Sequence, residues 1–336
     1  RLTGKRLNVR YVTPNAAPRA VFEAKLQKFF KKADIRSLFS GSGSFTDTTM
    51  NSYDALIVDE AHRLKMKSGM FKNLGENQIK EIINSARTSV FFIDEAQKVT
   101  WSDVGEINRI EDEANRQGAA IEKLQLTSQF RCGGSDDYLA WLDETLGVYS
   151  KTQHYFKKDS FDFRIFDDPK TLHEEIKKKN KINNKSRMVA GYCWNWISQK
   201  NPSLRDIQIQ KFGYEATWNL TEDGSQWIIS PNSVEEVGCI HTCQGLELDY
   251  VGVIVGPDLV TKNGELRTNP DARAKTDKSL AGFKTEFKTN PDLALAKADE
   301  LIRNTYRTLM SRGMKGCYVY FVDEATAEYF KKQLPE

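Results

Sequence analysis

Residues 53–62 read YDALIVDEAH, and this stretch decides the fold. Its four consecutive apolar residues, 55–58, are bounded by polar residues and are followed at once by Asp59 and Glu60. A short apolar run of this kind predicts a strand that is buried on both faces, as in a parallel sheet. The two acids then stand at the carboxyl end of the strand, where open α/β sheets bind their ligands.

Two interpretations of this acid pair are open on the residues alone. Neighbouring carboxylates repel each other, and burying them at a strand end costs free energy. A bound cation, or a role in accepting a proton, would offset that cost. The magnesium–ATP site of a nucleotide hydrolase supplies both uses: Asp59 would reach Mg²⁺ through its water shell, and Glu60 would polarise the attacking water. The alternative is a helix N-cap, where the helix dipole favours acidic side chains.

A second stretch repeats the pattern. Residues 89–97 read SVFFIDEAQ, so that Asp94 and Glu95 follow another apolar run and Gln97 lies just beyond them. A helical pattern over 78–85 separates the two runs, which predicts parallel strands of a doubly wound sheet with a site along one edge. The residues alone leave Asp94 and Glu95 open as a duplicated catalytic pair.

The alternation of strand and helix patterns continues to the end of the chain. It predicts an α/β fold of two parallel-sheet domains in tandem. Periodicity is lost and polarity rises over 147–160, so we expect domains at 1–150 and 151–336. The further strands that we expect lie at 123–126, 161–166, 188–194, 226–230, 237–240, 250–255 and 316–322, with helices at 171–179 and 293–310.

Composition narrows the class of protein. The 336 residues carry 49 basic and 46 acidic side chains, a formal charge of +3 that neither demands nor excludes nucleic acid. The five cysteines lack CxxC spacing, which predicts reduced thiols and no structural zinc. No apolar run reaches membrane-spanning length and residues 1–10 lack the apolar core of a signal peptide, so we expect a cytoplasmic protein without a membrane partner.

Five segments occur in the order and spacing of motifs II to VI of superfamily 1 helicases. They are IVDEAH (57–62), FFIDEAQ (91–97), LTSQFR (126–131), HTCQGLE (241–247) and NTYRTLMSRG (304–313). Together with AGYCWNW (190–196), these segments give residues 8–323 a resemblance to a bacterial family of helicase-like ATPases, largely uncharacterised. That family is related to the ATPase part of Schlafen proteins. The literal DEAH at 59–62 does not indicate a DEAH-box protein, because the second half has no QRxGRxGR segment and HTCQGLE is the superfamily 1 form of motif V.

The resemblance implies two RecA-like domains that hydrolyse ATP in the cleft between them, with Mg²⁺ as cofactor. Asp59 would hold Mg²⁺ through water, Glu60 would activate water, and Gln97 would sense the γ-phosphate with Asp94 and Glu95 as structural companions. Two arginines would contact the phosphates from either side of the cleft. They are Arg131, at the end of the first domain, and Arg312.

The resemblance also implies a nucleic-acid track. In motif V, Gln244, Gly245 and Glu247 would couple the nucleotide state to this track, with Glu247 near the ribose. Trp101 would stack on a base, with an ordinary half-buried aromatic as the alternative. Residues placed to contact the strand's backbone are Thr13, Asn15, Arg19, His241 and Thr242. The expected partner is single-stranded nucleic acid, with DNA favoured over RNA.

The start of the chain departs from the family pattern. Superfamily 1 enzymes open with a GxxxxGK[ST] phosphate loop, whereas residues 2–6 read LTGKR, without the earlier glycine or the Ser/Thr. We therefore expect a first domain that is incomplete at its N-terminus, a phosphate loop in an upstream segment that also brings a nuclease or effector domain, and weak ATP binding by this chain alone.

Two functions remain on the residues and the resemblance. The first is the core of an ATP-dependent nucleic-acid translocase or helicase. The second is a nucleic-acid-binding regulator or defence protein that keeps the helicase fold with weak or no ATP turnover.

Overall fold

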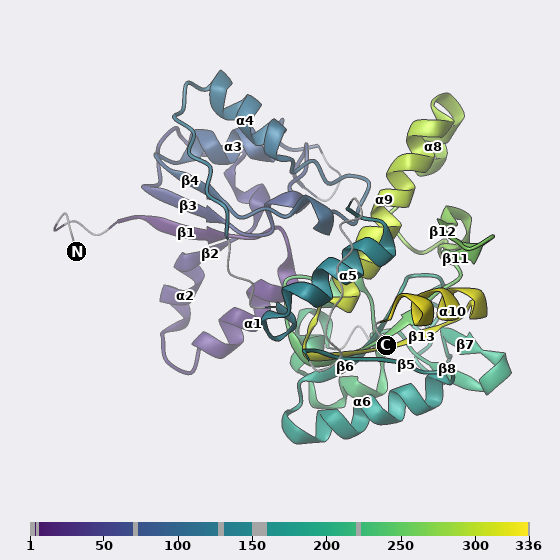
Figure 1. The fold of residues 1–336 in the computed structure, drawn as a ribbon. Coiled ribbons are helices and arrows are strands. Elements are labelled where there is room, and N and C mark those ends of the chain that lie inside the picture. Colours follow the sequence, from purple (N-terminus) through teal and green to yellow (C-terminus); the bar gives the residue numbers. More distant parts are fainter. Residues whose placement is uncertain are drawn as a thin grey trace. The chain divides into compact units, whose positions relative to one another are not determined.

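The computed structural model describes residues 4, 7–69, 73–126, 131–149, 160–219 and 223–334 (Figure 1). The chain divides into two compact units, residues 1–98 with 102–125 and residues 99–101 with 126–336. The division precedes the expected boundary at 150/151 because α5 (Asp136–Leu146) belongs to the second unit. There the Tyr138 hydroxyl donates to the Met310 carbonyl at 3.2 Å, and Trp141 Nε1 donates to the Gln333 carbonyl at 2.6 Å.

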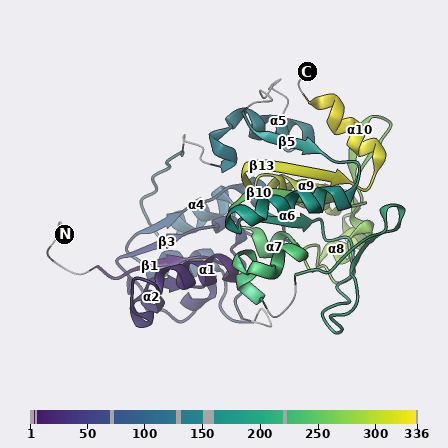
Figure 2. The ribbon, with the colours of Figure 1, turned by 90° about the horizontal axis from the view of Figure 1, so that it is seen from below.

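The first unit holds a four-stranded parallel sheet of order β2-β1-β3-β4 (Figures 1 and 2). Leu56 and Val58 of β3 are fully buried, and they share a core with Ile79 and Ile82 of the crossover helix α3. The expected parallel strands and their helical crossover are thus confirmed. The elements are β1 (Val9–Val12), α1 (Ala16–Leu26), α2 (Lys32–Leu38), β2 (Phe39–Ser40), β3 (Ala55–Val58), α3 (Gln78–Ser85), β4 (Ser89–Phe91) and α4 (Ile107–Arg116).

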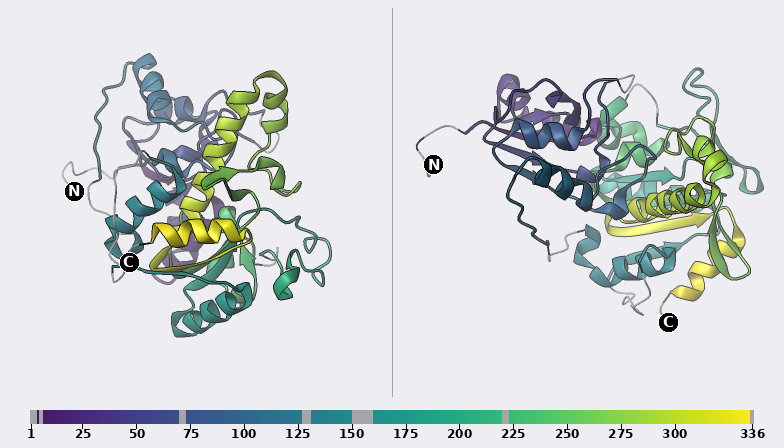
Figure 3. Two further views of the ribbon diagram at one scale, coloured as in Figure 1. Left: turned by 45° about the vertical axis from the view of Figure 1, so that its right-hand side comes forward. Right: turned by 90° about the horizontal axis from the view of Figure 1, so that it is seen from above.

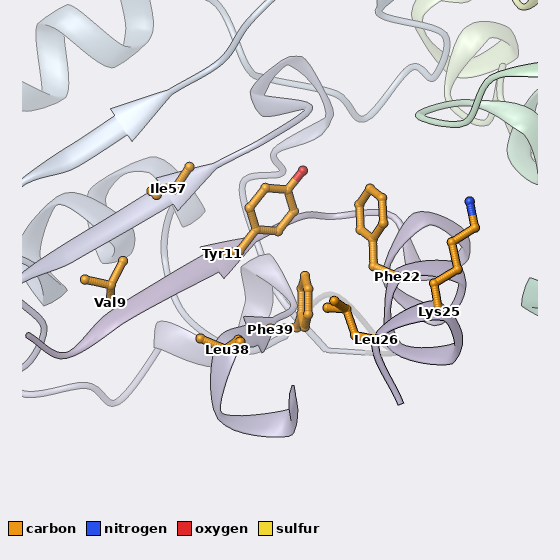
Figure 4. A pocket seen from close by; sticks show the side chains of 8 residues that line it. All are labelled: Val9, Tyr11, Phe22, Lys25, Leu26, Leu38, Phe39 and Ile57. Atoms are coloured by element: carbon orange, nitrogen blue, oxygen red, sulfur yellow. The ribbon is translucent and has the colours of Figure 1, made fainter. Parts of the chain in front are cut away.

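The opposite face of this sheet bears an apolar groove of about 520 Å³ (Figure 4). Tyr11, Phe22 and Phe39 contribute three aromatic rings to its wall, and Lys25 lies at the end of the groove. Ile57 of β3 also lines the groove and is only half-buried. The expectation that β3 is buried on both faces is therefore correct for the α3 side alone.

The second unit is built on a five-stranded parallel sheet of order β5-β13-β10-β6-β9. Helix α6 contacts β6 and β10 from one face, and α9 contacts β10 from the other (Figures 2 and 3). The main elements are β5 (Asp162–Ile165), α6 (Pro169–Asn183), β6 (Ser186–Ala190), β9 (Val237–Gly238), α7 (Ile240–Cys243), β10 (Leu248–Val255), α8 (Phe283–Thr289), α9 (Pro291–Met310), β13 (Gly313–Phe321) and α10 (Glu324–Gln333). Two hairpins, β7 (Ile207–Ile209) with β8 (Tyr214–Ala216) and β11 (Leu259–Lys262) with β12 (Glu265–Thr268), complete the unit.

Two expected strands are wrong. Residues 123–126 form no helix and do not pair with a described strand, and Leu124 is 86% exposed, so this segment has neither a ladder nor a core to stabilise it. Residues 226–230 fall largely in a 3₁₀-helix, Gly224–Ile229, which buries Trp227 and lets its Nε1 donate to Glu236 at 2.9 Å. In the part of the chain that the structure describes, no helix has the length and apolarity needed to cross a bilayer.

His173 is a buried residue of α6 whose two ring nitrogens are both engaged. Nε2 lies 2.8 Å from the Val234 carbonyl, which can only accept, so Nε2 carries the proton. Nδ1 lies 2.9 Å from the Tyr214 hydroxyl and accepts from it. Burial lowers the pKa of His173, and the neutral imidazole satisfies both partners.

Acidification is expected to destabilise the second unit through His173. Because its folded pKa lies below the unfolded value of about 6.5, its contribution to stability is complete above that pH and is lost as the pH falls below it. Urea unfolding at pH 8, 7, 6 and 5 measures the effect. His173→Gln should flatten the profile, whereas His241→Gln, at an exposed position, should leave it unchanged; equal profiles for wild type and His173→Gln would contradict the assignment.

Candidate active site

Asp59 is fixed at the carboxyl end of β3 by three hydrogen bonds. Its backbone N–H donates to the Val12 carbonyl at 2.8 Å, its Oδ1 accepts from the Glu60 N–H at 2.9 Å, and its Oδ2 accepts from the Tyr11 hydroxyl. Burial, followed by the bond to this carboxylate, raises the pKa of Tyr11 well above its usual value, so the phenol stays protonated and keeps donating. The Asp59 carboxylate is therefore held in one orientation while remaining partly exposed.

Glu60 is a buried acid on a strained backbone. Its φ of 56° and ψ of 40° are left-handed, a conformation that costs a non-glycine residue about 1–3 kcal/mol and that is concentrated at functional sites. Its Oε2 lies 3.1 Å from Nε2 of His62, and both side chains are almost completely buried. The Glu60 side chain makes no capping hydrogen bond to the 3₁₀ turn Ala61–Arg63, which argues against the N-cap interpretation.

Residues 103–105 buttress the turn that carries Glu60. Arg63 Nε lies 3.2 Å from Oδ2 of the buried Asp103, and the Val104 N–H donates to the Leu64 carbonyl at 2.8 Å. A Cβ added at Gly105 would lie only 1.9 Å from the Ala61 carbonyl oxygen. The backbone after Glu60 is thus packed directly against this segment.

Gly105→Ala is expected to lower the free energy of unfolding by about 1–3 kcal/mol, because the added methyl group must push the Ala61–Arg63 turn away. Urea unfolding measures the loss. Gly118→Asn is the matched control, since a Cβ at Gly118 meets no described atom within 4 Å and asparagine tolerates its φ of 68°. Equal midpoints for Gly105→Ala and wild type would contradict this packing.

The second acid pair is engaged in local structure. Asp94 accepts from Nε2 of the buried Gln97 at 2.8 Å and from the Ala96 N–H at 3.1 Å. Glu95 accepts from the Ile107 N–H at 2.7 Å, at the start of α4. These contacts match the implied role of structural companions to Gln97 and speak against a duplicated catalytic pair.

The three backbone-contact candidates of the first unit lie where β1 leads into α1, with Thr13 and Asn15 before the helix and Arg19 in it. The Thr13 side chain is fully buried, and its Oγ1 accepts from the Asn15 N–H at 3.4 Å. Arg19 Nη1 donates to the Thr13 carbonyl at 3.1 Å. Asn15 and Arg19 keep partial exposure, so they present the accessible side chains of this segment, and Thr13 shapes it.

Arg131 and Arg312 belong to the same unit. We expected Arg131 at the end of the first domain, but it lies in the second unit, which comprises residues 99–101 and 126–336. Burial raises the pKa of the Cys132 thiol to about 12, and the positive charges of Arg312 and Arg131 oppose this rise. Cys132 follows Arg131 in the sequence, and its thiol donates at 3.7 Å to the carbonyl of Ser311, the residue before Arg312.

Arg312 connects motif VI with motif V. It is almost completely buried, with Nε donating to the Thr308 carbonyl at 3.1 Å and Nη1 to the Leu246 carbonyl at 3.3 Å. Buried Gln244 ends α7 with an N–H bond to Ile240, and Gly245 follows with a left-handed φ of 79°. The two motifs are thus packed as one element.

The remaining motif V candidates differ in accessibility. Glu247 and His241 are exposed. Thr242 Oγ1 accepts from the Cys239 N–H at 3.0 Å and donates to the Cys239 carbonyl at 2.9 Å, so this hydroxyl is engaged at the start of α7. His241 and Glu247 are therefore the accessible side chains among these three.

Trp101 is packed within the second unit. Its ring meets Phe283 edge to face at 6.1 Å, and Lys297 Nζ lies 4.6 Å from the ring centre. A Cβ on Gly282 would lie 2.4 Å from the indole. This environment favours the half-buried aromatic over a base-stacking ring.

The donor set at β3 fits Mg²⁺ brought in with a nucleotide. Among the described residues, no three His, Cys, Asp or Glu side chains converge to form a metal cage. Nucleotide-bound Mg²⁺ needs only one or two carboxylates, because water and phosphate oxygens fill its other positions. The partly exposed Asp59 carboxylate meets that need.

Sequence reasoning missed Tyr11 and His62 as parts of this site. His62 stands two residues after Glu60 within the quoted stretch, which is a signal that could have been used. Tyr11 reaches Asp59 through the pairing of β1 with β3, in which Tyr11 is opposite Ile57, and that register is a long-range feature.

Several known proteins are similar to this chain in sequence or in structure. It is 26% identical over 305 residues to the uncharacterized protein YPL245W of Saccharomyces cerevisiae, covering 82% of this chain and 64% of the relative's length. S. cerevisiae Dbp5 bound to RNA and ADP BeF3 aligns over 97% of this chain and 74% of its own, with a TM-score of 0.33 and 11% identity. Mss116p bound to ssRNA and AMP-PNP aligns over 97% and 61%, with a TM-score of 0.35 and 10% identity. Structural scores this low support no conclusion about the site.

Residues 2–323 match the family model described as "Schlafen group 3, DNA/RNA helicase domain". The match covers almost the whole chain and agrees with the relation to Schlafen proteins implied by the ordered motifs. The chain therefore belongs to the Schlafen group 3 DNA/RNA helicase domain family.

Proposed function

We propose that this chain is the core of an ATP-dependent nucleic-acid translocase of the superfamily 1 type. The observation that carries the proposal is Glu60, a buried acid held in a left-handed conformation at the carboxyl end of the parallel strand β3. Strain of this kind at a ligand-binding edge indicates a functional demand, because a merely structural position would accept glycine or asparagine at lower cost.

The residues around Glu60 suit hydrolysis of a phosphoanhydride. Bound Mg²⁺–ATP supplies the electrophilic phosphoryl group and the cation that neutralises its charge. Asp59, kept in place by Tyr11, would hold the water shell of the cation. Glu60 would orient the attacking water and accept its proton, and the contact with His62 keeps the Glu60 carboxylate in position.

The second unit would couple the nucleotide state to the contact with a nucleic-acid strand. Arg312 bonds the carbonyl of Leu246, so a shift of the α9–β13 junction would be passed directly to the loop after α7. Helix α7 presents His241 at the surface, and the loop after it presents Glu247. A nucleotide-dependent movement of Arg312 would thereby change how these two side chains meet a nucleic-acid strand.

The proposed partner is single-stranded nucleic acid, with DNA before RNA, and the proposed compartment is the cytoplasm. This part of the proposal rests on the motif resemblance described above.

The second candidate is a nucleic-acid-binding regulator with weak or no ATP turnover. Its support is the burial of Arg312, whose guanidinium bonds main-chain carbonyls and is only 1% exposed. An arginine that stabilises a transferring phosphoryl group must reach that group. In this conformation Nε and Nη1 of Arg312 instead donate to main-chain carbonyls inside the unit.

Streptavidin displacement from biotinylated single strands separates the two candidates. With ATP, the full-length translocase should displace streptavidin from one end of the strand only, since movement is directional. With a non-hydrolysable ATP analogue it should displace none. Strand binding without displacement from either end, on both DNA and RNA, would contradict the translocase and favour the regulator.

A further inference from the structure

Helix α8 and the start of α9 form an arm of the second unit (Figures 1 and 3). This arm carries an exposed aromatic ring beside a pocket. Phe287 is 43% exposed. Because α8 repeats both residue types at a spacing of four, its phenylalanines lie on one face and its lysines on an adjacent one. The pocket has a volume of about 360 Å³, and its lining includes Asp271, Phe283, Lys284, Phe287, Lys288 and Leu295.

One of the residues that line this pocket is packed into a core. Phe283 is buried in a small core with Ala294 and Ala298, and it packs edge to face with Trp101. The ring of Phe287 lies against Phe283, with centroids 5.6 Å apart and planes at 43°. Phe287 is thus supported from within the unit while a large part of its surface faces solvent.

Two lysines lie beside this ring in the pocket lining. Lys284 and Lys288 are exposed, and within the described part of the chain neither makes an ion pair. The nearest acid along α8, Glu286, accepts from Nδ2 of Asn290 at 2.8 Å. An exposed aromatic ring beside lysines without carboxylate partners is the combination that single-stranded nucleic acid uses, since bases stack on the ring and phosphates pair with the lysines.

We propose that Phe287, Lys284 and Lys288 form a contact site for single-stranded nucleic acid, in which a base stacks on Phe287 and flanking phosphates pair with the two lysines. Asp271, the carboxylate in the pocket lining, accepts a hydrogen bond from the amino group of a stacked adenine, cytosine or guanine. The choice of ligand rests on the proposed function. Trp101 contributes by holding Phe283 in place, not by stacking on the base.

Fluorescence anisotropy with labelled single-stranded DNA and RNA oligonucleotides of equal length tests the site in the full-length protein. Phe287→Ala should weaken binding about five- to hundredfold, as the loss of one stacking platform does. Phe287→Trp should retain affinity and show emission quenching on binding that exceeds that of wild type, a signal that a purely structural role would not produce. Phe29→Ala is the control, because Phe29 is 78% exposed and lies in the first unit.

The salt dependence of binding tests the two lysines. Lys284→Gln and Lys288→Gln should each reduce the slope of log K against log salt by about one. Lys332→Gln, at an exposed position of α10, should leave the slope unchanged. The comparison of DNA and RNA shows which sugar the site prefers.

ATP turnover measured on the same samples keeps this site separate from the proposed motor. Weakened binding by Phe287→Ala in a protein without turnover would support the site and contradict the motor. Wild-type affinity for Phe287→Ala, or no binding of either strand by wild type, would overturn the site. If Phe287→Ala binds with wild-type affinity and a strand stimulates ATP turnover, the contact site is overturned and the proposed motor is not.

Discussion

Glu60→Gln is expected to lower ATP hydrolysis by the full-length protein about 100- to 10,000-fold, the range that a general base contributes. Glutamine keeps the size of the side chain but cannot accept the proton of the attacking water. Nucleotide binding should persist, because Asp59 and its bonds to Tyr11 and Val12 are unchanged. Steady-state phosphate release and binding of a fluorescent ATP analogue measure the two effects separately.

Glu95→Gln is the matched control for this variant. Glu95 also follows an apolar run and an aspartate, but its carboxylate accepts a backbone hydrogen bond from Ile107. It should keep turnover within a few-fold of wild type, since an amide oxygen still accepts that bond. Equal losses in Glu60→Gln and Glu95→Gln would revive the duplicated catalytic pair, and normal turnover in Glu60→Gln would exclude Glu60 as the base.

Arg312→Ala is expected to reduce both turnover and stability. Removing the guanidinium takes a donor from the buried Leu246 carbonyl, at a cost of about 1–3 kcal/mol for an unsatisfied group, whereas the Thr308 carbonyl still accepts from the Ser311 hydroxyl. If Arg312 also stabilises charge on the transferring phosphoryl group, turnover should fall by about 1,000-fold or more. Urea unfolding and phosphate release measure the two losses.

Two further variants serve as comparisons for Arg312→Ala. Arg312→Lys keeps the charge but has one nitrogen in place of the guanidinium fork, so it should recover part of the stability and little of the turnover. Arg267→Ala, which removes an exposed ion pair with Glu265, should change stability by less than about 1 kcal/mol. A folded Arg312→Ala protein with wild-type turnover would show that Arg312 is structural and does not stabilise the transferring phosphoryl group.

The parts of the fold that were predictable depend on local patterns. The run 55–58 is bounded by polar residues on both sides and the α3 pattern has a clear apolar face, so β3, α3 and β4 followed from the sequence. The acid pair at Asp59 and Glu60 was located for the same reason. The ordered motifs then placed the candidates of the second unit on their loops.

The parts that could not be predicted depend on long-range packing. Residues 226–230 have an apolar pattern that fits a strand, but the bond from Trp227 to Glu236 is made in a 3₁₀-helix. The unit boundary depends on α5 packing against α9 and α10, which no local pattern reveals. Trp101 is covered by residues about 180 positions further along the chain, so its exposure could not be read from its neighbours in sequence.

Within the site, the strained backbone of Glu60 is also invisible in the sequence. A glutamate at a left-handed position goes against local preference, and the buttress of Asp103, Val104 and Gly105 that holds the turn comes from beyond the second acid pair. Local backbone preferences therefore fail at Glu60, the residue that we propose as the general base.

ATP hydrolysis by the full-length protein, measured with no nucleic acid, with single-stranded DNA and with single-stranded RNA, tests the translocase proposal most directly. We predict turnover that one of the two strands stimulates and that Glu60→Gln abolishes. Absence of turnover under all three conditions, in a protein that still binds a strand, would contradict an ATP-driven motor and leave a nucleic-acid-binding regulator.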